Sequence, residues 1–144
     1  YMDGINLLGM VYARWRRQAS LALSPYGITL SQFQLIHLAR VRGSIAPSTA
    51  AAELGSDRPT MTLVARTCLE KGWLSRKASQ ADRRSFKLSL TGHGEELLDR
   101  IEGDGVLSPH RLGDPFDILG SDERADFLRM LDRVERRSKD VLGV

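Results

Sequence analysis

Four side chains that could recognise a nucleic acid stand together near the middle of the chain. Arg58, Thr60, Met61 and Thr62 begin a helical pattern. In the first turns of a helix that enters a DNA major groove, an arginine matches a guanine edge and threonines reach bases or phosphates. Met61 suits a thymine methyl, but it fits a core position equally well, and the sequence favours neither interpretation.

Basic side chains continue beyond this group. From Ser56 to Leu90 there are eight Lys or Arg against three Asp or Glu, a net charge of +5, whereas Thr91 to Val144 carries −5. Positive charge therefore concentrates in one stretch and predicts a surface that faces phosphates. The further candidates for DNA contact are Arg66, Arg76, Lys77, Arg83 and Arg84. For Arg83 and Arg84, a solvated turn is the alternative.

A pair of short helices is expected to position the first group. Thr49 to Leu54 reads as one helix, and Gly55 follows where a tight turn favours positive φ. Ser56 or Asp57 caps the second helix, and Gly72 ends it. Its apolar side chains recur every three or four residues and predict one buried stripe, made of Met61, Val64, Ala65, Cys68 and Leu69.

Two strand-like runs follow, Trp73 to Lys77 and Ser85 to Leu90. In the second, Phe86, Leu88 and Leu90 alternate with Lys87 and Ser89, which predicts one apolar face and one exposed face. Ile45 and Ala46 could add a short third strand. We call residues 73–90 the wing. These patterns predict a mainly α fold with a small β wing, that is, a winged helix-turn-helix.

The flanking segments predict further helices. Met2 to Leu23 and Ser31 to Val41 have helical periodicity, and Thr29 or Ser31 caps the second of them. Thr91 caps the helix after the wing. Three glycines and two prolines between residues 103 and 115 predict that this helix stops early and that an irregular loop follows. Ser121 is expected to cap the last helix.

Four motifs in this order resemble the MarR family of bacterial transcription regulators. They are Asp57-Arg58-Pro59-Thr60-Met61-Thr62, Leu69-Glu70-Lys71-Gly72-Trp73-Leu74, Asp82-Arg83-Arg84 and Leu88-Ser89-Leu90-Thr91. The resemblance covers roughly Gly27 to Leu98. It implies a DNA-binding lobe at residues 27–90 and dimerisation helices at 1–26 and 91–144. The family continues one long helix where this chain has the segment 103–120, so the dimer interface there is expected to differ.

The resemblance also implies what the protein does. It predicts a homodimeric repressor that binds a pseudo-palindromic operator in double-stranded DNA, with the wing arginines in the adjacent minor groove or on its phosphates. It further implies release by a small aromatic or anionic effector in a cleft beside the dimerisation helices. Candidates for the cleft lining are Tyr12, Arg14, Trp15 and His37, although each is more often a core or surface residue.

Other chemistries have weaker support. Cys68 could be a redox sensor, as in some MarR relatives, but its place on the apolar stripe favours an inert core thiol. The three histidines show no metal-ligand spacing, and no catalytic motif is present, so we expect no metal, no cofactor and no enzyme activity. An alternative function is a protein–protein module without operator binding, because fold does not determine function.

Composition agrees with a single globular chain. The 144 residues are 42% hydrophobic and 27% charged, which is ordinary for such domains. No apolar run reaches the roughly 18 residues of a membrane span, and no signal segment is seen. A single cysteine excludes an intrachain disulfide and suits a reducing compartment. We therefore expect a cytoplasmic protein with no membrane partner.

Overall fold

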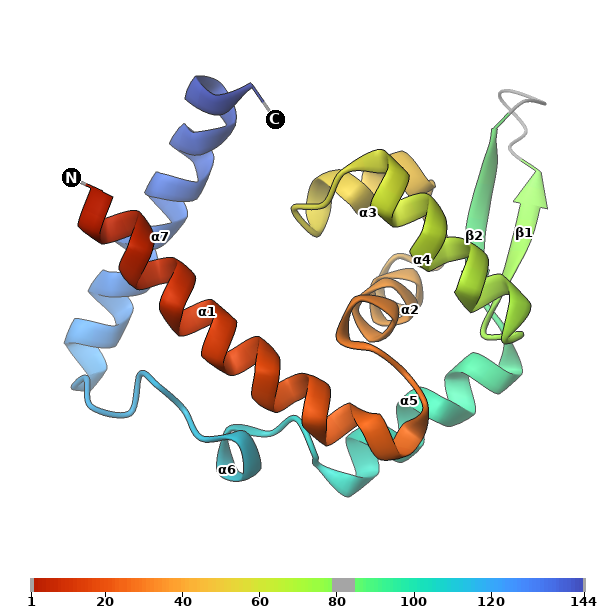
Figure 1. Cartoon of the computed structure of the whole chain (residues 1–144), viewed down its shortest axis with the longest axis horizontal. Coiled ribbons are helices and arrows are strands. Elements are labelled where there is room, and N and C mark those ends of the chain that lie inside the picture. Colours follow the sequence, from red (N-terminus) through yellow and green to blue (C-terminus); the bar gives the residue numbers. More distant parts are fainter. Residues whose placement is uncertain (1, 79–84, 144) are drawn as a thin grey trace. The chain divides into compact units, whose positions relative to one another are not determined.

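The computed structural model describes residues 2–78 and 85–143, with side chains from residue 3 onward. The chain divides into two compact units, Tyr1–Leu112 and Gly113–Val144. The first unit contains the two strands and most of the helices: α1 (Met2–Leu23), η1 (Ser24–Tyr26), α2 (Leu30–Arg42), α3 (Pro47–Glu53), α4 (Arg58–Glu70), β1 (Leu74–Ala78), β2 (Phe86–Leu90), α5 (Gly92–Asp104) and α6 (Pro109–Leu112). The second contains α7 (Ser121–Leu142). The expected fold, mainly helical with a small wing, is confirmed (Figure 1).

Local signals explain where the first two helices begin and end. Pro25 lies in η1, and Gly27 adopts φ 69°, so the chain leaves α1 by a tight turn. Thr29 caps α2: its Oγ1 accepts from the backbone N–H of Gln32, while the Gln32 side chain accepts from the N–H of Thr29. This reciprocal capping satisfies two helix-end donors. Of the two expected caps, Thr29 is confirmed.

The helix-turn-helix is α3 and α4, joined by a short turn. Gly55 has φ 63° at the turn, a region that side-chain-bearing residues rarely adopt. Asp57 caps α4. At the other end Gly72 has φ 75°, and the N–H of Trp73 donates to the carbonyl of Cys68, which is the hydrogen bond that closes a helix ending in glycine. α4 packs on α2, α3 and β1.

The wing is an antiparallel pair of strands. Leu74 pairs with Leu90 and Ala78 with Phe86. The expected third strand is a single bridge between Ile45 and Leu88, whose two backbone hydrogen bonds measure 2.9 and 2.8 Å. This bridge ties the wing to the start of α3.

One hydrophobic core runs through the first unit. Leu35 and Ile36 of α2, Leu88 of β2, and Leu98 and Ile101 of α5 are among its largest fully buried side chains. Arg40 adds a polar contact at its edge, where its guanidinium meets the carboxylates of α5. Residues 27–90 and α5 therefore share a core.

One strand prediction was wrong. Ser89 was expected on the exposed face of the wing, but it is 5% exposed and its hydroxyl has no hydrogen-bond partner. β2 leads directly into α5, whose Gly94 approaches Trp73 and Leu90, the residue after Ser89, very closely. Strand alternation predicts which face a residue occupies, not which face stays uncovered.

The helix after the wing stops early, as expected, but the segment that follows contains the short helix α6 where an irregular loop was expected. α5 ends at Asp104, and Gly105 takes φ 62° at its C-cap. In the second unit, the expected Ser121 cap is replaced by Gly120, whose N–H donates to Glu123 at 3.0 Å. The loop before α7 packs on that helix through Phe116 and Phe127, with ring centroids 5.5 Å apart. None of the described helices is both long enough and apolar enough to span a membrane.

Candidate nucleic-acid interface

The start of α4 is held by its cap. The carboxylate of Asp57 accepts from the backbone N–H of Thr60 at 2.7 Å and from its hydroxyl at 2.9 Å. These hydrogen bonds hold the pKa of Asp57 below its ordinary value, because they favour the charged form. The first turn of α4 is therefore fixed in place, and the Thr60 hydroxyl proton is already used.

Thr62 is engaged in a similar way. Its hydroxyl donates to the carbonyl of Arg58 at 2.9 Å. A hydroxyl has one proton and two lone pairs, so Thr60 and Thr62 are left as acceptors while these bonds persist. Both are exposed. In this arrangement they suit the amino group of a base better than a phosphate.

Met61 is a core residue. Its side chain is 2% exposed and lies on the buried stripe with Ala65 and Cys68. The interpretation of Met61 as a thymine contact is corrected, because a buried thioether does not reach a groove. The core interpretation, which the sequence supported equally, is the right one.

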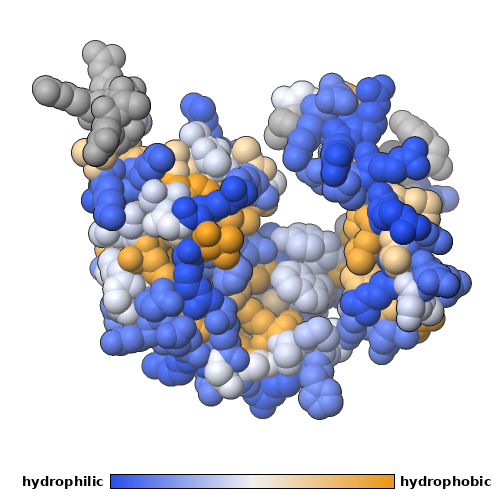
Figure 2. Space-filling model, turned by 180° about the vertical axis from the view of Figure 1, so that it is seen from behind, coloured by the Kyte–Doolittle hydropathy of each residue, from blue (hydrophilic) through white to orange (hydrophobic). Residues whose placement is uncertain are grey.

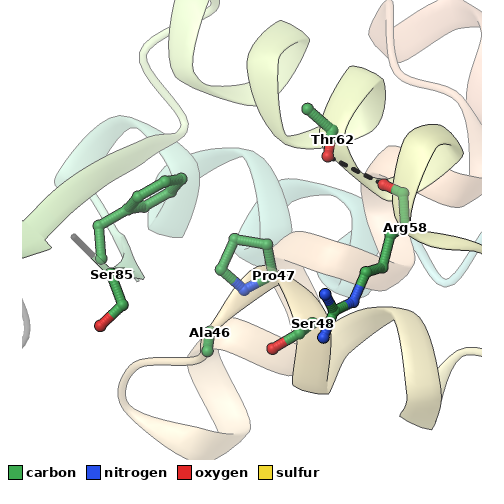
Figure 3. A pocket seen from close by; sticks show the side chains of 7 residues that line it. Ala46, Pro47, Ser48, Arg58, Thr62 and Ser85 are labelled. Carbon is green, nitrogen blue, oxygen red and sulfur yellow. Dashed lines mark hydrogen bonds between the residues drawn. The ribbon is translucent and has the colours of Figure 1, made fainter. Parts of the chain in front are cut away.

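Arg58 and Arg66 are exposed on α4. The Arg58 side chain extends toward Ser48 at the start of α3 (Figure 3). It borders an open pocket of about 360 Å³ lined by Ala46, Pro47, Ser48, Arg58, Thr62, Ser85 and Phe86. Arg58 thus lines a pocket formed by the starts of α3 and α4 and the start of β2.

The basic side chains of the wing occupy two faces. Arg76 lies over the ring of Phe86, with its guanidinium carbon 4.2 Å from the ring centroid. Lys77 is next along the strand and so points to the other face, where its cross-strand partner is Lys87. Paired like charges repel, and both lysines are exposed. Such a pair is suited to a phosphate.

Lys87 was absent from the candidates that the sequence suggested. The charge count included it, but only the antiparallel register places it beside Lys77. Arg83 and Arg84, with Asp82, lie outside the described residues. Their role at the wing tip stays a prediction.

The candidate effector residues form two separate stacks. Tyr12 and Trp15 stack on α1 with centroids 6.1 Å apart, while His37 stacks on Phe33 of α2 at 5.8 Å. His37 also lies 3.9 Å from a carboxylate oxygen of Glu102. Arg14 is exposed on α1. None of the four lines the pocket beside Arg58, and a shared cleft stays a prediction.

Cys68 has the surroundings of an inert thiol. It is 0% exposed, and burial raises its pKa to about 12. Reactive cysteines have a lowered pKa and solvent access. Within the described ranges, no group of three or more His, Cys, Asp or Glu residues could hold a metal ion.

Comparison with known proteins finds one family and several relatives. The model of the MarR family matches residues 28–86. The HTH-type transcriptional regulator PecS of Dickeya dadantii is 28% identical over 135 residues, covering 92% of this chain and 80% of PecS. The transcriptional repressor MprA of Escherichia coli is 31% identical over 98 residues, covering 67% of this chain and 56% of MprA.

A solved structure has a similar fold and a bound partner. It is the crystal structure of a cysteine-to-serine mutant of MarR from E. coli, complexed with operator DNA. It is 25% identical to this chain, with a TM-score of 0.78, and the alignment covers 90% of this chain and 91% of that one.

Proposed function

Because the chain belongs to the MarR family, we propose that it is a DNA-binding transcription regulator and not an enzyme. It acts as a homodimer on a pseudo-palindromic operator and represses transcription until an effector releases it. Its place of action is the cytoplasm, where it meets double-stranded DNA.

One observation carries this proposal: α4 is built as a recognition helix. Its first turn is locked by Asp57, and its inner side is buried through Met61, Ala65 and Cys68. Arg58 at its start and Arg66 on its outer side are exposed. A recognition helix needs this division, because one side must fix its position in the lobe and another must reach bases and phosphates. The operator complex of the E. coli relative supports the same use of the fold.

The remaining basic side chains are assigned to the backbone of the duplex. Lys77 and its partner Lys87 lie on one face of the wing and Arg76 on the other. Arg83 and Arg84 extend the charge toward the wing tip in the sequence. Phosphate contacts of this kind orient a protein on DNA and supply affinity, whereas base contacts supply sequence choice.

Dimerisation is assigned to the helices at the chain ends. The first half of α1 exposes large apolar side chains, with Ile5 65%, Leu8 38% and Tyr12 49% exposed. α7 does the same with Leu128 and Val134. A second copy would cover such faces. Two recognition helices would then enter successive major grooves about 34 Å apart.

An effector would act by preferring one dimer arrangement. It releases DNA only to the extent that it binds the released form more tightly than the DNA-bound form. We propose a small aromatic or anionic molecule near Tyr12, Arg14, Trp15 and His37, a position that rests on the sequence resemblance.

A salt-titrated mobility-shift assay on the DNA upstream of the protein's own gene tests the proposal. The expected result is tighter binding to one duplex than to a shuffled control, with the logarithm of affinity falling by about 0.9 for each phosphate contact per unit of log salt. Absence of binding to any duplex would instead support the protein–protein module. Loss of DNA binding on peroxide treatment that does not occur in the Cys68→Ser variant would support the redox alternative.

A further inference from the structure

The outer side of α4 carries an exposed leucine. Leu63 is 59% exposed and lies two residues before the buried Ala65. Two residues correspond to about 200° around a helix, so Leu63 points away from the core. Leu63 stays exposed because the apolar residues that α4 buries lie on the opposite side of the helix.

The neighbours of Leu63 on the helix surface are Pro59 and Thr60 in the preceding turn and Arg66 and Thr67 in the following turn. Pro59 precedes it by four residues and Arg66 follows by three, so both share its face. All three side chains are exposed. Pro59 has no backbone N–H to offer. Leu63 and Pro59 therefore expose apolar groups, with one guanidinium and two threonine side chains beside them.

The hydroxyl protons of the nearby threonines are already used in hydrogen bonds within the protein. The Thr62 hydroxyl donates to the carbonyl of Arg58, and the Thr67 hydroxyl donates to the carbonyl of Leu63 at 3.2 Å. Their protons are directed back into the helix. The donors left on the exposed sides of α4 near Leu63 are the guanidinium groups of Arg58 and Arg66.

In a major groove, an apolar side chain has one partner that distinguishes bases, the C5-methyl group of thymine. We propose that Leu63 is a specificity-determining residue that contacts a thymine methyl in each half-site, in the place that Met61 does not take. This inference rests on the proposed function. The preferred half-site then has a thymine at the position facing the second turn of α4.

Removal of single methyl groups from the DNA tests this contact. A duplex is first selected from a randomised pool with the full chain, and each thymine is then replaced by deoxyuridine, which differs only in lacking the methyl. Burial of one methyl-sized group corresponds to about fourfold in affinity per half-site and about fifteenfold for both. We expect this loss for the unmodified chain at one symmetric pair of thymines.

The variant Leu63→Ala removes the protein side of the same contact. It should bind the thymine and deoxyuridine duplexes equally, because the group that contacts the methyl is gone. Val41→Ala is the matched control, since Val41 is another exposed aliphatic side chain, 66% exposed and located on α2. It should keep the full discrimination. Leu63 is exposed, so its truncation should leave the fold intact, which a thermal melt verifies.

The outcomes separate this inference from the function on which it rests. A selected duplex that tolerates every deoxyuridine, or a Leu63→Ala chain that still discriminates, overturns the role of Leu63 while operator binding stands. Failure to enrich any duplex overturns the proposed function and this contact with it.

Discussion

At the scale of single residues, Arg58 is the side chain whose role most needs a measurement. It is exposed at the start of α4 and extends toward Ser48, from where its long side chain could turn to a guanine or to a phosphate. We expect Arg58→Ala to reduce the preference for one base pair by about 1–3 kcal/mol. Affinities for the selected duplex and for single-base variants of it measure this preference.

The control for Arg58 is Arg133→Ala, which removes one exposed positive charge from α7. It should leave base preference unchanged. If Arg58→Ala weakens specific and random duplexes by equal factors, Arg58 contacts the backbone and base reading falls to other residues of α4.

We expect the thiol of Cys68 to be unreactive in the folded protein. With a pKa near 12 and no solvent exposure, its thiol should react with iodoacetamide at pH 8 only as fast as the protein opens. Mass spectrometry with and without denaturant measures both rates. Rapid labelling of the folded protein, accompanied by loss of DNA binding, would contradict the inert thiol.

The raised pKa of Cys68 also makes the stability of the protein depend on pH. The pKa is raised on folding, so the folded state holds this proton more tightly than the unfolded state. The contribution is complete at neutral pH, begins to fall near the ordinary thiol pKa of 9.0, and is lost as pH rises to about 12. Cys68→Ala should flatten the decline of unfolding free energy over this window. Equal slopes for the two proteins would exclude the effect.

Single residues also show what a sequence can and cannot reveal. Periodicity placed Met61 on the buried stripe of α4, and its position in the first turns of that helix placed it among the DNA contacts. Only the packed structure, where it is 2% exposed, separates the two. Leu63 attracted no attention in the sequence. Its significance depends on knowing which side of α4 is covered.

At the scale of elements, α5 is fixed against the wing by a close approach. A Cβ added to Gly94 would lie 2.3 Å from the carbonyl oxygen of Trp73 and 2.6 Å from Leu90. Since the first of these is backbone, Gly94→Ala should lower the free energy of unfolding by about 1–3 kcal/mol. Urea denaturation measures the change.

Gly103 in the same helix is the matched control. A Cβ there meets nothing within 4 Å, so Gly103→Ala should stabilise by up to about 1 kcal/mol through helix propensity. Equal effects of the two substitutions would mean that the contact of Gly94 with Trp73 does not govern the packing of α5.

Element boundaries were largely predictable because their causes are local. Thr29, Asp57 and Thr91 cap helices, and Gly55 and Gly72 take the positive φ that their turns require. What failed depended on neighbours distant in sequence. The third strand is reduced to one bridge, and the pairing of Lys77 with Lys87 follows from strand register alone.

At the scale of the whole molecule, the division of charge agrees with the division of tasks. The net +5 of residues 56–90 lies on α4 and the wing, while the −5 of residues 91–144 lies on α5 and beyond. Hydrophilic side chains cover most of the face drawn in Figure 2, and hydrophobic residues are exposed in patches between them.

The domain division suggested by the sequence, 27–90 for DNA and 1–26 with 91–144 for dimerisation, stays a prediction. The two compact units separate instead at Leu112 and Gly113, inside the segment where glycines and prolines were expected to interrupt a helix. Composition thus located the interruption. It did not reveal that α5 shares its core with residues 27–90.

The exposed apolar face of α1 is the proposed dimer interface on which operator binding would depend. If the apolar face of α1 meets a second copy, Leu8→Glu places an unpaired carboxylate in that interface and should raise the dimer dissociation constant at least about a hundredfold. Asn6→Glu is the matched control, because it adds the same charge on another side of the same exposed turn. Sedimentation equilibrium measures the association. On DNA, Leu8→Glu should lose most of its affinity for a duplex with two half-sites and little for one half-site, since only a dimer gains from the second. A Leu8→Glu chain that still sediments as a dimer would place the interface elsewhere.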